Sequence, residues 1–116
     1  MPPDLLFVYG TLRSEFDNRY ARMLRKRASL IGRATVPGSI YRIGHYPGFR
    51  PEPAGAVQGE LYRLQDAAIR DALDRYEGPE FERVIVEIER APVWIYKYRK
   101  LPPESSRIEA GDFRAA

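Results

Sequence analysis

Two short stretches of the chain combine residue types that could bind and transform a small molecule. In the first, Tyr9-Gly10-Thr11-Leu12-Arg13, an apolar run ends in a glycine turn. Such a turn exposes successive backbone N–H groups, which can hold a carboxylate or phosphate oxygen without a charged side chain. A glycine turn after a strand is also a common way simply to reverse the chain, so both interpretations stay open.

The second stretch contains Glu77, which the sequence places at the C-terminal end of a helix. Because the helix macrodipole is negative there, a carboxylate is disfavoured at this position by roughly a few tenths of a kcal/mol. If the side chain is also partly removed from water, its pKa rises, and a general base near neutral pH requires a raised pKa. The alternative is an exposed glutamate in a Glu-Gly helix cap, where water screens the charge.

The composition excludes several kinds of catalytic centre. The chain of 116 residues has no Cys and one His, His45. The lack of Cys excludes thiol nucleophiles, redox dithiols and thiolate metal sites, and a single imidazole excludes a multi-histidine metal site. The sequence has neither a P-loop nor a dinucleotide-binding glycine pattern. We therefore expect no metal and no organic cofactor, and we interpret His45 as a turn residue.

The charge pattern raises a different possibility. The chain carries 19 Lys and Arg against 16 Asp and Glu, a net charge of +3. Much of the basic excess lies in one predicted helix, which could contact phosphate or an acidic partner. We favour a solvated helix face over a nucleic-acid partner, because no aromatic platform or groove-reading motif accompanies these charges. The basic residues are Arg19, Arg22, Arg25, Lys26 and Arg27.

The apolar runs are too short to cross a membrane. The longest, such as residues 5–9, are far below the roughly 18 residues that a membrane span needs. The N-terminus lacks a basic segment followed by an apolar signal core. We therefore expect a soluble, cytoplasmic protein with no membrane partner.

The elements that must position these residues follow from hydrophobic periodicity and turn signals. Apolar runs and alternating patterns predict strands at residues 5–9, 30–36, 39–43, 56–62, 84–89 and 93–98. A spacing of three and four residues predicts helices at 18–28, capped by Asp17 or Asn18, and at 66–76, ended by Gly78 and Pro79. The Pro and Gly content of residues 44–55 predicts an irregular loop.

Two helices and about six strands in this order do not form a regular βαβ series. The expected fold class is therefore α+β, a compact, mixed and mostly antiparallel β-barrel with peripheral helices. A chain of this length can bury about two-thirds of its surface, so we expect a single domain over residues 1–116.

Five segments together resemble the gamma-glutamylcyclotransferase-like family, the small AIG2-like proteins. They cover nearly the whole chain, and the motifs YGTL, GELY and LDRYEG in this order and spacing are highly specific. The segments are LFVYGTLR (6–13), PGSIYRIGHYPG (37–48), QGELYRL (58–64), ALDRYEGPEFERVIVEI (72–88) and IEAGDFR (108–114).

The resemblance implies a β-barrel with a pocket between the glycine turn and the glutamate. Carried over to the matching positions, Tyr9, Gly10, Thr11 and Leu12 would hold the substrate and Glu77 would transfer the proton. The implied activity is that of a gamma-glutamylcyclotransferase, which acts on a small gamma-glutamyl substrate. Its α-amine attacks the γ-carbonyl and releases 5-oxoproline and a free amine, without a cofactor.

The sequence departs from the family pattern at two positions. Phe81 stands where the family often has Tyr, so a phenolic hydroxyl that could touch the substrate is missing. Phe113 stands where Trp is common, a conservative change for packing. Within the C-terminal tail, residues 99–116, Pro102-Pro103 locally indicates a mobile linker, whereas the resemblance implies that the end of the tail docks on the barrel.

Three hypotheses follow from these observations. The leading one is a cyclotransferase. The alternative keeps the pocket without the chemistry, as a binding module for an amino-acid-like small molecule, and the third makes the basic helix an interaction surface. Because members of the family accept different gamma-glutamyl compounds, the resemblance does not specify the departing amine. The sequence also gives no indication of the oligomeric state.

Overall fold

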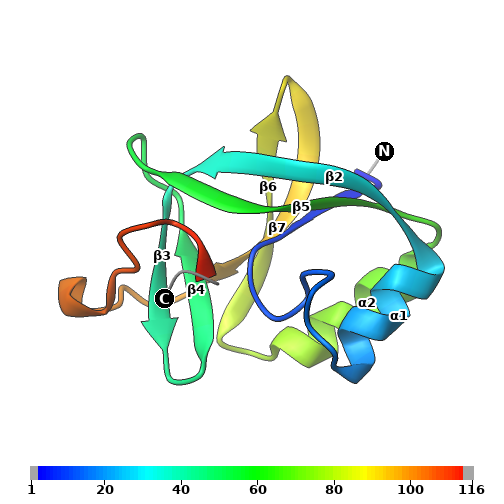
Figure 1. Cartoon of the computed structure of the whole chain (residues 1–116), viewed down its shortest axis with the longest axis horizontal. Coiled ribbons are helices and arrows are strands. Elements are labelled where there is room, and N and C mark those ends of the chain that lie inside the picture. Colours follow the sequence, from blue (N-terminus) through cyan, green and yellow to red (C-terminus); the bar gives the residue numbers. More distant parts are fainter. Residues whose placement is uncertain (1–2, 114–116) are drawn as a thin grey trace.

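The computed structural model describes residues 3–113. This part of the chain contains seven strands, two α-helices and one short 3₁₀-helix, joined by loops (Figure 1). This is the α+β class expected from the sequence. The helices are α1 (Arg19–Arg27), α2 (Ala67–Glu77) and the 3₁₀-helix η1 (Glu104–Ser106). The strands are β1 (Leu5–Val8), β2 (Ala28–Pro37), β3 (Ser39–Ile43), β4 (Tyr46–Arg50), β5 (Ala56–Leu64), β6 (Phe81–Ile88) and β7 (Ala91–Tyr98).

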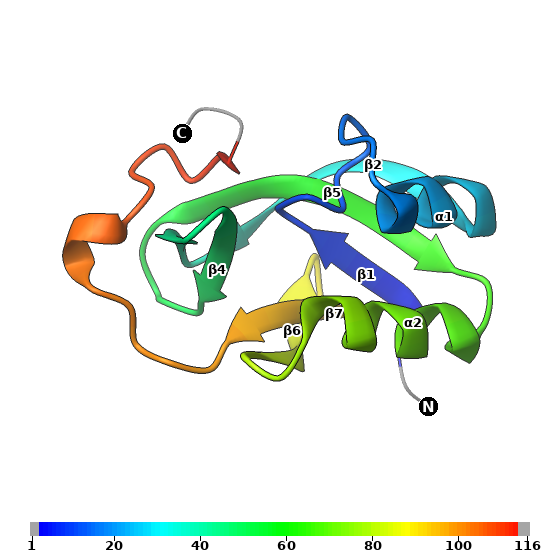
Figure 2. The ribbon, with the colours of Figure 1, turned by 90° about the horizontal axis from the view of Figure 1, so that it is seen from below.

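The strands form one mixed sheet that curls into an incomplete barrel (Figures 1 and 2). The strand order is β2-β5-β1-β7-β4-β3, and β6 pairs with β7 beside this path. Pairs β1–β5, β2–β5, β3–β4 and β6–β7 are antiparallel, whereas β1–β7 and β4–β7 are parallel. Strand β1, which leads into the glycine turn, therefore lies in the middle of the sheet.

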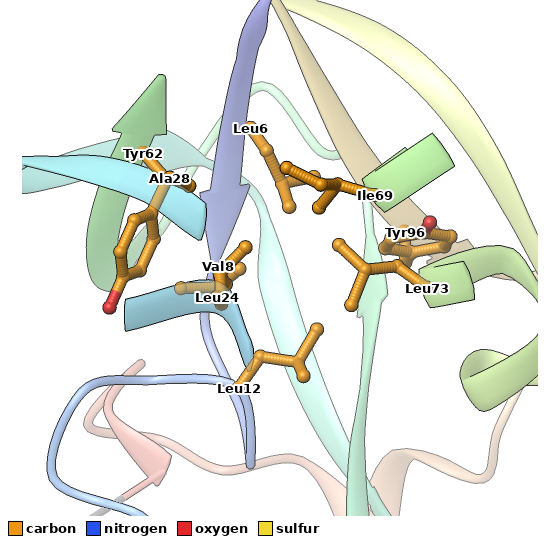
Figure 3. Packing of buried hydrophobic residues seen from close by; sticks show 9 residues of the cluster. All are labelled: Leu6, Val8, Leu12, Leu24, Ala28, Tyr62, Ile69, Leu73 and Tyr96. Carbon is orange, nitrogen blue, oxygen red and sulfur yellow. The ribbon is translucent and has the colours of Figure 1, made fainter. Parts of the chain in front are cut away.

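Strand β1 is buried on both of its faces because its side chains alternate between two cores. Leu6 and Val8 belong to a cluster shared with the two helices, and Phe7 and Tyr9 belong to a second cluster inside the curled sheet. Figure 3 shows side chains of β1, α1 and α2 pointing toward one another in the first cluster. The glycine turn thus begins from a strand that is held on two sides.

Both helices begin at a side-chain cap, and the cap of α1 is Asn18, one of the two candidates that the sequence predicts. Asn18 accepts a hydrogen bond from the Ala21 N–H (2.8 Å), and Asp66 accepts one from the Ile69 N–H (3.2 Å). Such caps satisfy N–H groups that have no partner within the helix. Neither α1 nor α2 has the length and apolar character of a membrane-spanning segment among the described residues.

The prediction of an irregular loop over residues 44–55 is wrong for its first half. Residues 46–50 form β4, which pairs in register with β3 and contacts β7. Tertiary packing overrides the low strand propensity of this segment. Phe49 is fully buried, and Gly48 lies so close to Tyr98 that a Cβ atom would come within 2.9 Å of the tyrosine Cβ. Residues 51–55 are irregular, as expected.

The chain after β7 returns to the sheet. The Ile108 N–H donates to the Ile40 carbonyl (2.9 Å), and the Gly111 carbonyl accepts from the Gln58 N–H (2.7 Å). Ile108 is 8% exposed and joins the core inside the curled sheet. Residues 114–116 of the predicted tail lie outside the described residues.

Candidate functional site

A small cavity of about 180 Å³ lies where the end of β1, the end of α2 and the β3–β4 hairpin meet. It is smaller than the roughly 300–1,000 Å³ of pockets that take drug-sized ligands. No Lys, Arg or His belongs to this lining of described residues. The residues that line it are Phe7, Val8, Tyr9, Gly10, Thr11, Leu12, Tyr46, Pro47, Tyr76, Glu77, Glu80, Phe81 and Tyr96.

The glycine turn is held from its outer side. Its carbonyl groups are occupied: the Gly10 carbonyl accepts from the Arg13 N–H (3.1 Å), and the Thr11 carbonyl accepts from Asn18 Nδ2 (2.7 Å). The N–H groups of Gly10, Thr11 and Leu12 make no hydrogen bond with a described residue. The turn therefore has backbone donors to offer to a ligand.

Gly10 is required by a close approach between the turn and the hairpin. A Cβ atom at this position would lie 2.8 Å from Pro47 Cγ. Pro47 itself is buried in β4, the strand that sequence reasoning missed. The glycine thus lets the turn close one wall of the pocket against the hairpin.

The other wall of the pocket ends at Glu77. This residue is the last of α2, and Gly78 follows it with a φ of 83°, a conformation that suits glycine. The carboxylate of Glu77 makes no hydrogen bond or ion pair with a described residue. Burial raises its pKa from the ordinary 4.5 to about 7. A carboxyl group in this state titrates near neutral pH, which suits a group that accepts and returns a proton.

Four phenols and one further carboxylate share the pocket with Glu77. The phenols are those of Tyr9, Tyr46, Tyr76 and Tyr96. The negative charge of Glu77 contributes to raised pKa values of Tyr9, Tyr76 and Tyr96, although burial is the larger cause in each case. These tyrosines therefore remain neutral. Glu80 lies at the exposed rim of the same pocket.

Two tyrosine hydroxyls tie the glycine turn to its surroundings. Tyr76 and Thr11 share a hydrogen bond of 2.7 Å between their hydroxyl groups, which links α2 to the turn. The buried Tyr9 hydroxyl donates to the Tyr96 carbonyl (2.6 Å) and accepts from the Phe49 N–H (3.1 Å). The position of the turn is thus fixed relative to α2, β7 and β4.

The structure brings all five sequence-predicted site residues into the lining of one pocket. The hydrogen bond between Thr11 and Tyr76 joins the two stretches, although 65 positions separate these residues in the sequence. From the sequence, Tyr46 and Tyr96 are two of several tyrosines whose hydroxyls could line a polar pocket, and Pro47 is not singled out as a lining residue. Their aromatic or apolar character was compatible equally with a core position, so only the fold reveals them. No three His, Asp or Glu side chains gather as a metal-binding group within residues 3–113.

Two of the basic side chains of α1 contact the loop that precedes this helix. Arg22 pairs with Asp17 (2.8 Å), and Arg25 donates to the carbonyl groups of Ser14 (3.0 Å) and Phe16 (2.8 Å). These contacts fit the interpretation of a solvated helix face that also supports the loop before α1.

The chain combines a curled mixed sheet with a pocket between a glycine turn and a desolvated glutamate. This combination places it in a class of small, pocket-bearing α+β proteins. The pattern of the family described as "Gamma-glutamyl cyclotransferase, AIG2-like" matches residues 6–115. The chain therefore belongs to this family.

One sequence relative carries a related description, and two solved structures share the fold. Over 85 residues the chain is 32% identical to YkqA of Bacillus subtilis, described provisionally as a gamma-glutamylcyclotransferase; the match covers 72% of this chain and 30% of YkqA. The chain thus spans less than a third of that relative. In solved structures, the uncharacterized protein PH0828 of Pyrococcus horikoshii has a TM-score of 0.79 at 21% identity, covering 96% of this chain and 90% of the other. An AIG2-like protein of Mus musculus has a TM-score of 0.66 at 21% identity, covering 90% and 82%.

Proposed function

We propose that the chain is a gamma-glutamylcyclotransferase that converts a gamma-glutamyl amide into 5-oxoproline and a free amine. The observation that carries this proposal is that one small pocket holds the Glu77 carboxylate and the backbone N–H groups of the glycine turn, none of which has a hydrogen-bond partner among the described residues. Membership of the family and the provisional description of YkqA support the same reaction class.

The glycine turn suits the α-carboxylate of such a substrate. Because the described lining holds two carboxylates and no basic side chain, an anionic group is best received by the N–H donors of Gly10, Thr11 and Leu12. The α-ammonium group of the substrate then faces Glu77, whose charge attracts it. In this pose the amine folds back toward the γ-carbonyl of the same molecule.

The reaction then moves two protons from the ring nitrogen to the departing nitrogen and needs no cofactor. Glu77 removes a proton from the ammonium group, and the freed nitrogen attacks the γ-carbonyl carbon to form the ring C–N bond. The bond to the departing amine breaks as Glu77 returns this proton to the departing nitrogen. The ring nitrogen loses its second proton to the released amine, so the products are neutral at the lactam nitrogen and cationic at the amine. Ring closure is intramolecular, and well-oriented reactions of this type reach effective molarities of roughly 10⁵ M or more. Positioning therefore supplies much of the rate.

The test is a panel of gamma-glutamyl amino acids, gamma-glutamyl amines and glutathione, with 5-oxoproline measured by mass spectrometry. Wild type is expected to form 5-oxoproline from at least one class, and Glu77→Gln from none, while circular dichroism shows both to be folded. A matched control is Glu87→Gln, the same change at an exposed position. Glu87 lies near the end of β6 that is remote from Phe81, which lines the pocket. This control is expected to retain wild-type turnover.

Turnover by Glu77→Gln close to that of wild type would contradict the assigned role of Glu77. Absence of product from every compound, together with saturable thermal stabilisation by one of them, would instead indicate a binding module.

A further inference from the structure

Tyr96 bonds to both halves of the pocket through different atoms. It lies on β7, is 4% exposed, and lines the cavity. Its main-chain carbonyl accepts a hydrogen bond from the hydroxyl of Tyr9, the residue before the glycine turn (2.6 Å). Its own hydroxyl donates to Oδ1 of Asp74, on the last turn of α2 (2.7 Å). Tyr96 is therefore bonded both to the residue that precedes the glycine turn and to α2, the helix that carries Glu77.

Asp74 is in turn held firmly by β6. Arg83 donates to both of its carboxylate oxygens, from Nε to Oδ1 (2.8 Å) and from Nη2 to Oδ2 (3.1 Å). The guanidinium group of Arg83 stacks on the Trp94 ring, 4.1 Å from its centroid. Burial acts to raise the pKa of Asp74, but the hydrogen bonds from Arg83 and Tyr96 hold it below its ordinary value. Bidentate, charge-assisted pairs of this kind fix geometry.

The last turn of α2 needs such an anchor. A backbone bond from the Gly78 N–H to the Asp74 carbonyl (3.1 Å) closes the helix end, and no side chain within residues 3–113 donates to the carbonyl groups of this turn. Glu77 carries a partly desolvated carboxylate at the negative end of the helix dipole, so solvation favours a movement of this turn toward water. The anchor through Asp74 opposes that movement.

We propose that Tyr96 and Asp74 are positioning residues, which hold Glu77 at a fixed distance from the glycine turn. The inference rests on the proposed function and deepens it, because it assigns the geometry of the reaction to a hydrogen-bonded chain: Arg83, Asp74, Tyr96 and Tyr9. Neither residue transfers a proton to the substrate.

The first test compares Tyr96→Phe with wild type on a compound that is turned over. The ring and its packing stay, while the bond to Asp74 is lost. We expect kcat to fall by about tenfold to a hundredfold with KM within about twofold, because a misplacement near 1 Å has effects of this size. The matched control is Tyr41→Phe, which removes a hydroxyl bonded to the Glu52 carboxylate (2.8 Å) outside the pocket, and its kcat is expected to be unchanged.

Asp74→Asn keeps one acceptor oxygen and the shape of the side chain, so a smaller loss of kcat is expected. The double variant with Tyr96→Phe is expected to lose little more than Tyr96→Phe alone, because both changes break the same anchor. If the kcat of the double variant fell by the product of the two single losses, the two residues would act independently, which would contradict a shared anchor.

The second test does not depend on turnover. The Glu77 carboxyl carbon, assigned by comparison with Glu77→Gln, is titrated by ¹³C NMR in wild type, Tyr96→Phe and Tyr41→Phe. We expect the pKa of Glu77, about 7 in wild type, to fall toward its ordinary value in Tyr96→Phe only.

A lowered melting temperature of Tyr96→Phe with unchanged kcat and unchanged Glu77 pKa would show a purely structural role and overturn the inference. If wild type turns over no compound, the proposed function fails, and the NMR titration decides the positioning role by itself.

Discussion

At the scale of single residues, two buried or partly buried glutamates, Glu60 and Glu77, have opposite environments. Glu60, 9% exposed, accepts hydrogen bonds from the Ser14 N–H and hydroxyl, each at 2.6 Å. Glu77 has no such partner among the described residues. Buried carboxylates are normally hydrogen-bonded, so the exception points to a group kept available for a ligand.

The raised pKa of Glu77 predicts the pH dependence of turnover. As a base it must be ionised, and burial raises its pKa to about 7. We therefore expect kcat/KM to increase by about tenfold per pH unit below this value and to level off above it. Initial rates measured between about pH 5 and pH 9 test this, and a profile that is flat through neutrality would contradict it.

The same pKa predicts a pH-dependent stability difference between wild type and Glu77→Gln. The pKa is about 7 in the folded chain against 4.5 ordinarily, so the folded state binds more protons between these values. The free energy of unfolding of wild type thus decreases as the pH rises through this window, and Gln removes the penalty. Because the pocket opens to solvent, we expect a gain of about 1–3 kcal/mol above the window.

Thermal melts of the two proteins test this prediction. The melting temperatures are expected to coincide near about pH 4 and to differ near about pH 8.5, with Glu77→Gln the more stable. Glu87→Gln is expected to follow wild type at both. If Glu77→Gln were less stable than wild type at the higher pH, the folded state would stabilise the ionised carboxylate, and the prediction would be contradicted.

At the scale of elements, β1 and α2 were predictable because their signals are local. An apolar run ended by glycine and a helical spacing ended by Gly-Pro mark residues 5–9 and 66–76, within two residues of the observed bounds. Strand β4 was not predictable, because its Pro and Gly are accommodated through packing on β7 and on the glycine turn. The Asp74–Tyr96 bond was also hidden, since it joins residues 22 positions apart.

The Tyr9 hydroxyl links β4 and β7 to the residue that follows β1, and its removal is expected to destabilise the fold. Tyr9→Phe leaves the Phe49 N–H and the Tyr96 carbonyl buried without this partner. We expect a loss of about 1–3 kcal/mol in the free energy of unfolding, measured by denaturant titration. Tyr46→Phe, at a tyrosine that is 55% exposed, is the control and is expected to have no effect. Equal stability of Tyr9→Phe and wild type would contradict the linking role.

At the scale of the whole molecule, the curled sheet brings the two ends of the pocket together and the C-terminal segment supports the back of the glycine turn. Arg13, which follows the turn and is 3% exposed, donates to Asp112 (2.8 Å). The Phe16 and Phe113 rings stack with centroids 5.9 Å apart. The resemblance of residues 108–113 to the family pattern implied this docking, whereas Pro102-Pro103 taken locally did not.

Gly111→Ala is expected to undock this segment. Gly111 has a φ of 67°, and a Cβ atom there would overlap the Ala56 carbonyl oxygen. We expect a lower melting temperature and faster proteolytic cleavage after residue 99 than in wild type. Gly44→Ala, at a glycine with a similar φ of 60° but open space around it, separates backbone strain from the overlap. Similar cleavage of both variants would contradict docking through Gly111.

The central claim is that the pocket closes a ring within its substrate, with Glu77 as the proton carrier. The most direct measurement is mass spectrometry of the products formed in ¹⁸O-labelled water from a gamma-glutamyl amine that the protein turns over. The account predicts unlabelled 5-oxoproline and one equivalent of free amine from wild type, and neither from Glu77→Gln. Glutamate carrying the heavy oxygen would show that water, and not the α-amine, attacks the γ-carbonyl, and would contradict the account.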